Sequence, residues 1–382
     1  MTMTLSANIS QMWNKSVKIM AVSAISMLAV ACGQKDDTAA AASDAAVDFK
    51  GENIEFIVPF NAGGGTDKWA RFYAPLLSKN LPGEPNIIIK NMPGGGSTKG
   101  ANFFTQRAEK DGMTILASSA SSQIPFLLGD KRVEYNYADW QAVVASPTDG
   151  VVYVSADSGI KNIDDLMKAD QSKLVFGSQG PTSMDLVPLL ALDLLDIKPQ
   201  TVFGMKGKKD TRLAFMRGET NLDFQSSSAY LTDVAPDVES GKAIPLFVFG
   251  TLDEQGNLQR DPTFPDLPHF GEVYKQVKGE DLSGEAYQTW KKLFVASFPA
   301  QKMIVLPKGT PDNVVNAYNE AMEKVVSDPG FAEASKDQLG DYQQIVGAEA
   351  DKIKTEATDF SPESRKWIQD WLRTNYQVTE FD

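Results

Sequence analysis

Apolar and polar residues follow one another along the chain in three units, each of which predicts a short strand, a turn of small residues and an amphipathic helix. In the first unit, 54–59 is a short apolar run and 61–65 contains three consecutive glycines. Thr66 or Asp67 is the expected N-cap of the helix that follows. Its apolar positions recur at helical spacing: Trp69, Phe72, Tyr73, Leu76 and Leu77.

Two further stretches repeat this pattern. One predicts a strand over 87–89, a turn over 93–96 and a helix that starts near Ser97. The other predicts a strand over 174–176 and a turn over 177–181, with Thr182 or Ser183 as the N-cap of its helix. Strands that alternate with helices predict an α/β fold with parallel or mixed sheets, in which ligands bind at the carboxyl ends of the strands.

A strand, a glycine turn and a helix N-terminus together form an anion-binding site. Neither triple-glycine run has the spacing of a dinucleotide fingerprint or of a phosphate-binding P-loop, so nucleotide binding is not predicted. A glycine turn alone also occurs as a plain connection, but three such units in one chain favour an anion-binding role for at least two of them. The hydroxyl-rich run 118–122 follows an apolar strand pattern and adds donors at another strand end.

The N-terminal segment has the pattern of an export signal. Lys15 and Lys18 precede the uncharged run 19–31, which ends at Cys32, the sole cysteine. The run is shorter than the roughly 20 residues of a membrane-spanning helix. Residues 29–33 resemble a bacterial lipobox, which predicts a lipidated Cys32; an ordinary signal peptide with an incidental cysteine is the alternative. Residues 32–48 are small and polar and predict a flexible tether.

Composition excludes several classes of function. The net charge of −13 argues against nucleic acid and means that local dipoles, rather than the global field, must attract an anionic ligand. The single histidine, His269, is expected to be a surface or packing residue. With one histidine and no further cysteine, histidine metal clusters and Ser-His or Cys-His nucleophiles are excluded. An all-oxygen Ca²⁺ or Mg²⁺ site stays open, although no Asp-x-Asp-x-Asp-Gly loop occurs; neither a cofactor nor a resident metal is expected.

An ordered set of motifs then resembles the solute receptors of tripartite tricarboxylate transporters, the Bug-type periplasmic binding proteins. The first glycine loop carries the signature, and the second loop, an Asp-Gly-Met-Thr turn and a Ser-x-Gly loop follow in the family's order. The motifs span about residues 50–375: Pro59, Phe60, Ala62–Gly64, Asp67, Ala70 and Arg71; Asn91, Pro93–Gly96 and Gly100; Asp111–Thr114; Tyr137, Asp139 and Trp140; Gly177, Ser178 and Gly180; Lys206 and Gly207; Leu306, Pro307 and Gly309–Pro311.

The resemblance implies a two-lobed type II periplasmic-binding-protein fold, α/β in class, with mixed sheets flanked by helices and a ligand cleft between the lobes. Residues 49–146 and 256–382 would form the first lobe and residues 147–255 the second. The C-terminal part is expected to include a helix after 361–364 that packs on a lobe. The segment 251–290 is longer than is usual in the family, and Pro181 and Lys99 depart from its loops.

The resemblance further implies that backbone N–H groups, hydroxyls and ordered waters bind a ligand carboxylate. Asp67 could instead only cap its helix, Arg71 is expected to pair with Asp67 at i,i+4, and Lys206 is either a solvated charge or a contact to a distal carboxylate. The predicted ligand contacts are Phe60, Asn61, Ala62, Gly63, Gly64, Gly65, Thr66, Asp67, Gly95, Gly96, Ser97, Ser119, Ser121, Ser178, Gln179, Gly180, Thr182, Ser183, Lys206, Gln225 and Ser226.

The function expected from these residues is capture of a small di- or tricarboxylate, or an aromatic carboxylate, by a periplasmic, membrane-anchored monomer. A membrane permease of the tripartite tricarboxylate type would be its partner, and lobe closure its mechanism. An exported hydrolase or lyase that uses the glycine loops as an oxyanion site is one alternative, but the sequence contains no G-x-S-x-G motif. A receptor that feeds a sensor kinase is the other.

Overall fold

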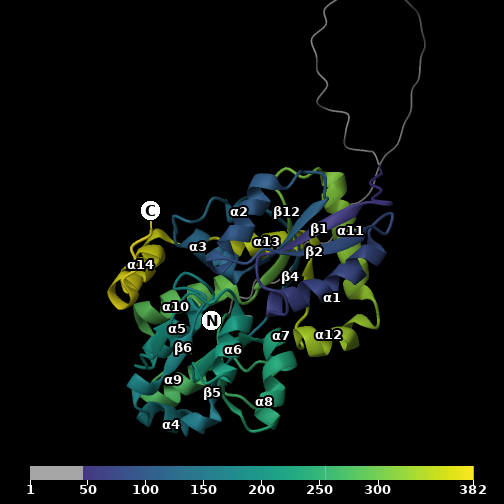
Figure 1. Cartoon of the computed structure of the whole chain (residues 1–382). Helices are drawn as coiled ribbons and strands as arrows, with labels where there is room; N and C mark the ends of the chain where they lie inside the picture. Colours follow the sequence, from purple (N-terminus) through teal and green to yellow (C-terminus); the bar gives the residue numbers. More distant parts are fainter. Residues whose placement is uncertain (1–45, 254, 382) are drawn as a thin grey trace, which may run out of the picture. The chain divides into compact units, whose positions relative to one another are not determined.

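The computed structural model describes residues 46–253 and 255–381, which belong to one compact unit. The expected signal segment, Cys32 and nearly all of the expected tether lie outside the described residues. Two mixed β-sheets flanked by helices organise the described part (Figure 1), and the expected α/β fold class is confirmed. Within the described ranges, no helix combines the length and the apolar character that a membrane span requires.

The first sheet has six strands in the order β13-β4-β12-β3-β1-β2. β1 runs parallel to β2 and β3, whereas β12 runs antiparallel to β3 and β4. Its strands are β1 (Asn53–Val58), β2 (Asn86–Asn91), β3 (Thr114–Ser119), β4 (Gln141–Ser146), β12 (Lys302–Leu306) and β13 (Ile345–Val346). The helices associated with it are α1 (Gly65–Asn80), α2 (Thr98–Arg107), α3 (Ala120–Leu127), α11 (Asp312–Ser327), α12 (Phe331–Leu339) and α13 (Gly347–Ala357).

The second sheet has five strands in the order β7-β6-β8-β5-β9. The strands are β5 (Gly150–Ser155), β6 (Val175–Gly177), β7 (Gln200–Val202), β8 (Leu222–Ser226) and β9 (Ala243–Val248). Its helices are α4 (Ile163–Lys168), α5 (Leu186–Leu194), α6 (Lys208–Met216), α7 (Ser227–Ala229) and α8 (Ala235–Glu239). The described chain also contains five short helical turns: Gly95–Ser97, Tyr137–Asp139, Ala156–Ser158, Gln171–Lys173 and the π-turn Tyr230–Val234.

The chain passes between the two sheets at two places. Residues 147–149 lead from β4 to β5, and residues 298–301 lead from α10 (Gly284–Ser297) into β12. Between β9 and α10 lie the hairpin β10 (Thr251–Leu252) and β11 (Leu258–Gln259) and helix α9 (Phe270–Lys278), which contacts β9. The last helix, α14 (Pro362–Tyr376), contacts α10. The expected lobe boundaries stay a prediction, and α9 shows that the segment after residue 255 also packs on the second sheet.

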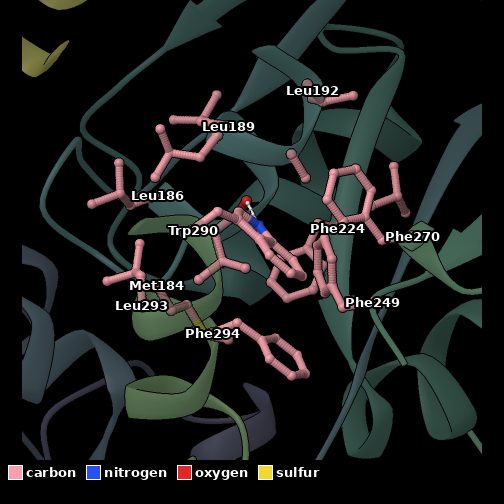
Figure 2. Close-up of a cluster of buried hydrophobic side chains, with 14 of the residues drawn as sticks. Met184, Leu186, Leu189, Leu192, Phe224, Phe249, Phe270, Trp290, Leu293 and Phe294 are labelled. Atoms are coloured by element: carbon pink, nitrogen blue, oxygen red, sulfur yellow. Dashed lines mark hydrogen bonds between the residues drawn. The ribbon is translucent and has the colours of Figure 1, made fainter. Parts of the chain in front are cut away.

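The largest buried apolar cluster surrounds α10. Trp290 is fully buried among aromatic and aliphatic side chains from α5, β8 and α9, and its indole N–H donates to the carbonyl of Val187 at 3.1 Å (Figure 2). Ile124 of α3 and Ile368 of α14 belong to the same cluster. Because elements of both sheets contribute to this core, α10 holds the second crossing at a fixed place between them.

The three strand–turn–helix units of the sequence are present. β1, β2 and β6 lie within one or two residues of the predicted strands, and α14 follows Ser361, whose hydroxyl accepts the N–H of Ser364 as an N-cap. Ile368 and Leu372 of α14 are fully buried, as expected for a helix packed on the core. The predicted N-caps of the first and third helices are wrong, for reasons that lie in the loops described next.

Candidate functional site

The first glycine loop is shaped by Asp67, which is not the N-cap that the sequence predicted. Gly64 is the N-cap of α1, and the buried Asp67 carboxylate accepts the N–H of Gly63 at 2.7 Å and the amide of Asn91 at 2.9 Å. Arg71 Nε also donates to it at 2.9 Å, so the expected i,i+4 pair is confirmed. Burial opposes the charge of Asp67, but the hydrogen bonds from Arg71, Gly63 and Asn91 outweigh it and hold the pKa below its ordinary value.

The N-terminus of α1 is buried without a side-chain cap. Gly64, Gly65, Thr66 and Asp67 are all buried, and among the described residues no side chain caps this helix. A helix start leaves several N–H groups without intrahelical partners and carries a partial positive charge. A buried terminus that lacks a protein acceptor is therefore suited to an anionic ligand.

Hydroxyl groups of the second sheet lie directly against this helix start. A Cβ atom on Gly65 would lie 3.3 Å from Ser226 Oγ and 3.4 Å from Ser228 Oγ, so the glycine permits the close approach. Ser226 ends β8 and Ser228 lies in α7, so both come from the other half of the structure. The start of α1 therefore packs against two hydroxyls and the methyl group of Ala229 from the other half of the structure.

Polar contacts also close the first loop onto α6 and the π-turn. Asn61 donates from its side-chain amide to Asp210 at 2.9 Å, and Lys209 Nζ donates to the carbonyl of Ala62 at 2.9 Å. On the next turn of α1, Lys68 Nζ pairs with Asp233 at 2.5 Å. The structure therefore has the two halves in contact at this loop.

The second glycine loop has an unusual backbone. Gly94, Gly95 and Gly96 all have positive φ, and Ser97 has a φ of 111°, so the helix begins at Thr98 after a short 3₁₀ turn. The Ser97 hydroxyl is 3.0 Å from the Ser122 hydroxyl and is buried. Gly96 approaches Ser183 of the opposite half, where an added Cβ would lie 3.9 Å from Ser183 Cβ.

Asp185 organises the third loop. It is the N-cap of α5, so the prediction of Thr182 or Ser183 as the N-cap was wrong. Their hydroxyls are used elsewhere: Thr182 donates to Asp130 at 2.7 Å, and Ser183 donates to the carbonyl of Gly180 at 2.7 Å. The buried Asp185 carboxylate accepts the N–H of Gln179 at 2.7 Å.

Lys208 is a buried residue that sequence reasoning missed. Its Nζ lies 3.0 Å from Asp185 Oδ1 and 3.3 Å from Asp223 Oδ1, and both carboxylates are fully buried. Burial alone would lower the pKa of Lys208, but Asp185 and Asp223 outweigh it and raise the pKa above its ordinary value. In the sequence Lys208 stands between Lys206 and Lys209, where nothing distinguishes it from a solvated lysine.

The other predicted contacts fall into different environments. Ser121 accepts the N–H of Met184 at 3.1 Å and so links the two halves, whereas Ser119 caps α3 by accepting the Ser121 N–H. Gln225 donates to the carbonyl of Lys208 inside the second half, and Lys206 is exposed. Gln179 is buried, and both polar atoms of its side-chain amide are without a hydrogen-bond partner within the described chain. Direct ligand contact by these residues stays a prediction.

No group of three or more His, Cys, Asp or Glu residues suited to a metal ion occurs among the described residues. His269 is the N-cap of α9: its Nδ1 accepts the N–H of Gly271 at 3.1 Å, which agrees with a packing role. The polar groups at the start of α1 and on the second sheet facing it are backbone N–H groups and the hydroxyls of Ser226 and Ser228.

Two sheets joined by short crossings, with polar loops facing each other between them, are the arrangement expected of a two-lobed protein that binds a ligand between its halves. The family model of the tripartite tricarboxylate transporter family receptor (TctC) matches residues 70–358, and the chain belongs to this family. This confirms the family that the motifs indicated.

Relatives and solved structures agree with this assignment. The chain is 26% identical over 297 residues to the UPF0065 protein in the tcbD-tcbE intergenic region of Pseudomonas sp. (strain P51), over 76% of this chain and 79% of that protein. It resembles the periplasmic binding protein BugD with a TM-score of 0.63 at 21% identity, over 85% of this chain and 97% of BugD. MatC of Rhodopseudomonas palustris, solved with bound malate, gives 0.63 at 20% identity, over 83% of this chain and 98% of MatC.

Proposed function

We propose that this receptor binds a small di- or tricarboxylate, or an aromatic carboxylate, between its two sheets and delivers it to a membrane permease of the tripartite tricarboxylate type. The buried, uncapped N-terminus of α1, facing Ser226 and Ser228, is the observation that carries the proposal. Its N–H groups attract a carboxylate locally, which suits a chain of net charge −13. Membership of the receptor family and the malate bound by MatC support the ligand class and the partner.

Capture would proceed by closure of the two lobes around the crossings. The contacts of Asn61 with Asp210 and of Lys209 with Ala62 would form on closure and break on release. At the first crossing, the buried Asp149 carboxylate accepts the N–H groups of Phe249 at 3.1 Å and Gly250 at 2.7 Å. These bonds tie the crossing to the end of β9.

The test is titration calorimetry of the purified receptor with a panel of mono-, di-, tri- and aromatic carboxylates, followed by mass spectrometry of the recovered ligand. We expect one class of carboxylate to bind and to be recovered unchanged. A panel that gives neither heat nor a thermal shift would contradict the proposal, and turnover of a bound ligand would favour an enzyme instead.

We expect Gly64→Asp to remove carboxylate binding while it leaves the fold intact. The N-cap has a φ of −83° and room for a side chain, with an added Cβ 3.5 Å from the nearest atom. An aspartate here accepts the free N–H groups of α1 and repels a ligand carboxylate, which we expect to cost about 30-fold or more in affinity and to add a few tenths of a kcal/mol of stability. Calorimetry and thermal unfolding measure both effects.

Gly64→Ala is the matched control for this change. Alanine fits the same backbone conformation but offers no acceptor, so the helix N–H groups stay available and affinity should stay within a few-fold of the parent. Equal affinities of the aspartate variant and the parent would show that the ligand does not bind at the start of α1.

The proposal extends to the N-terminal segment, which lies outside the described residues. We propose that the chain is exported to the periplasm and anchored through lipidated Cys32. Intact-mass analysis of the mature protein should show a diacylated Cys32 N-terminus, and Cys32→Ser should release the receptor into the soluble periplasmic fraction. A mature protein of unmodified mass that still contains the tether would contradict the anchor.

A further inference from the structure

Three lysines are buried in the described chain, and one of them has no carboxylate partner. Lys208 pairs with Asp185 and Asp223, and Lys354 pairs with Asp351 at 3.0 Å and donates to backbone carbonyls. Lys302 is 3% exposed, and within the described chain its Nζ has one hydrogen-bond partner, the hydroxyl of Ser228 at 3.2 Å. A buried ammonium group is costly without a counter-ion.

The strand register places Lys302 at the edge where a ligand would bind. Lys302 begins β12, opposite Ser119 at the carboxyl end of β3 and Ser146 at the end of β4. The carboxyl ends of parallel strands are the ligand-binding edge of such a sheet. Lys302 therefore lies at the junction of the first sheet with the second half of the molecule, which supplies Ser228.

The side chain of Lys302 lies on the same face of the sheet as α1. Side chains two residues apart in a strand share a face, and Ile304 packs in the cluster that contains Trp69 of α1. Ser146, the strand partner of Lys302, accepts the indole N–H of Trp69 at 2.8 Å. Both observations put Lys302 beneath the first turns of α1.

The ammonium of Lys302 and the start of α1 both lie close to the hydroxyl of Ser228. Ser228 Oγ is 3.2 Å from Lys302 Nζ and would be 3.4 Å from a Cβ on Gly65. Two positive centres, a lysine and the uncapped end of a 16-residue helix, are thus buried against the same group. The groups that surround Lys302 here, Ser119, Ser146 and Ser228, are neutral hydroxyls, and none of them balances this charge.

We propose that Lys302 binds the ligand directly, as the counter-ion that pairs with the ligand carboxylate at the N-terminus of α1. This inference rests on the proposed function, because it takes the ligand to be a carboxylate. One carboxylate oxygen accepts from Lys302 Nζ and the other from the N–H groups of α1, with Ser228 between them. The pair requires an anion, so a carboxamide of the same shape leaves the buried cation unpaired and is rejected.

Proton uptake on binding is the signature of this arrangement. Burial alone lowers the pKa of Lys302 to about 7 in the unliganded protein, so at pH 8 most molecules hold a neutral amine there. Pairing with a carboxylate raises the pKa again, and the amine takes up a proton as the ligand binds. Above pH 7 the affinity of the parent protein is therefore expected to fall by up to about tenfold per pH unit, until the pKa of the liganded state is reached.

The test is calorimetry at pH 6 and pH 8 in buffers of different ionisation enthalpy, with the carboxylate that binds in the panel and with its amide. We expect the parent to take up close to one proton per ligand at pH 8 and much less at pH 6, and to prefer the acid over the amide about 100-fold or more. Lys302→Met should lose 100-fold or more in affinity and all of the linked proton uptake. Lys354→Met, which replaces a buried lysine on α13, is the control. Its affinity should stay within a few-fold of the parent's, and it should keep the linked proton uptake.

The outcomes separate the two proposals. Binding of a carboxylate with no proton uptake by the parent at pH 8 would overturn the role of Lys302 and leave the receptor function standing, and this measurement needs no variant to fold. Unchanged affinity in a folded Lys302→Met protein would overturn it in the same way. A parent protein that binds no carboxylate at all contradicts the proposed function itself.

Discussion

Lys302→Met is expected to make the unliganded receptor more stable at neutral and acid pH, although the same change weakens its ligand binding 100-fold or more. The free energy of unfolding should rise by about 1–4 kcal/mol at pH 6, the range known for buried ion pairs that are replaced by apolar residues of similar volume. The physical reason is that the folded chain buries the ammonium with one hydroxyl partner, whereas the unfolded chain solvates it. Urea unfolding at several pH values measures the effect.

The gain in stability from Lys302→Met is expected to decrease as the pH rises. Burial lowers the pKa of Lys302 from 10.5 to about 7, so between these values the unfolded chain binds more protons than the folded one. The stability contributed by this group in the parent therefore rises with pH from about 7 to 10.5, and the advantage of the methionine variant shrinks over the same window. A parent and variant of equal stability at pH 6 would show that Lys302 is not buried as an unpaired cation.

This stability cost connects the structure to the proposed ligand. A receptor that holds an unpaired cation in its closed form is less stable empty than liganded, because the ligand carboxylate supplies the missing partner. Ligand binding then stabilises the protein by mass action, and relief of this cost is part of the affinity that sets the size of the effect. The thermal shift caused by a given ligand concentration should accordingly be much smaller in Lys302→Met than in the parent protein.

Much of the fold could be predicted from local patterns. The strand over 54–59 and the glycine turn after it follow from apolar runs and small residues, which act over a few positions. The N-caps could not be predicted in the same way. Gly64 serves as a cap without a side chain, and Thr182 is taken by Asp130, a partner 52 residues away in the sequence. Such long-range bonds leave no trace in local spacing.

For the same reason, only part of the site could be predicted from the sequence. Glycine loops and serines at strand ends can be recognised from the local composition, and the structure brings Gly65 together with Ser226. Lys302 could not be recognised in this way, because the side chain of a lysine at the start of an apolar strand usually lies in solvent. Its burial depends on α7 of the other sheet, which covers it through Ser228. The charge environment of a lysine is a tertiary property that one sequence cannot supply.

Lys208→Met tests this point, since the same chemical change is expected to have the opposite effect. Lys208 is enclosed by Asp185 and Asp223, both fully buried, at 3.0 and 3.3 Å. Removal of the lysine leaves two buried carboxylates without a cation, which costs about 3–5 kcal/mol of unfolding free energy at pH 7. The third loop should loosen with it, because Asp185 also accepts the N–H of Gln179.

Measurement of this variant separates the two kinds of buried lysine. Urea unfolding at pH 7 should show the loss, because two buried carboxylates are left without their cation. Lys208→Met paired with Asp185→Asn removes one of the stranded charges and should recover part of the stability. If Lys208→Met and Lys302→Met shift stability in the same direction at pH 7, carboxylate pairing does not decide what a buried lysine costs in this fold, and the assignment of Lys302 to the ligand loses its energetic basis.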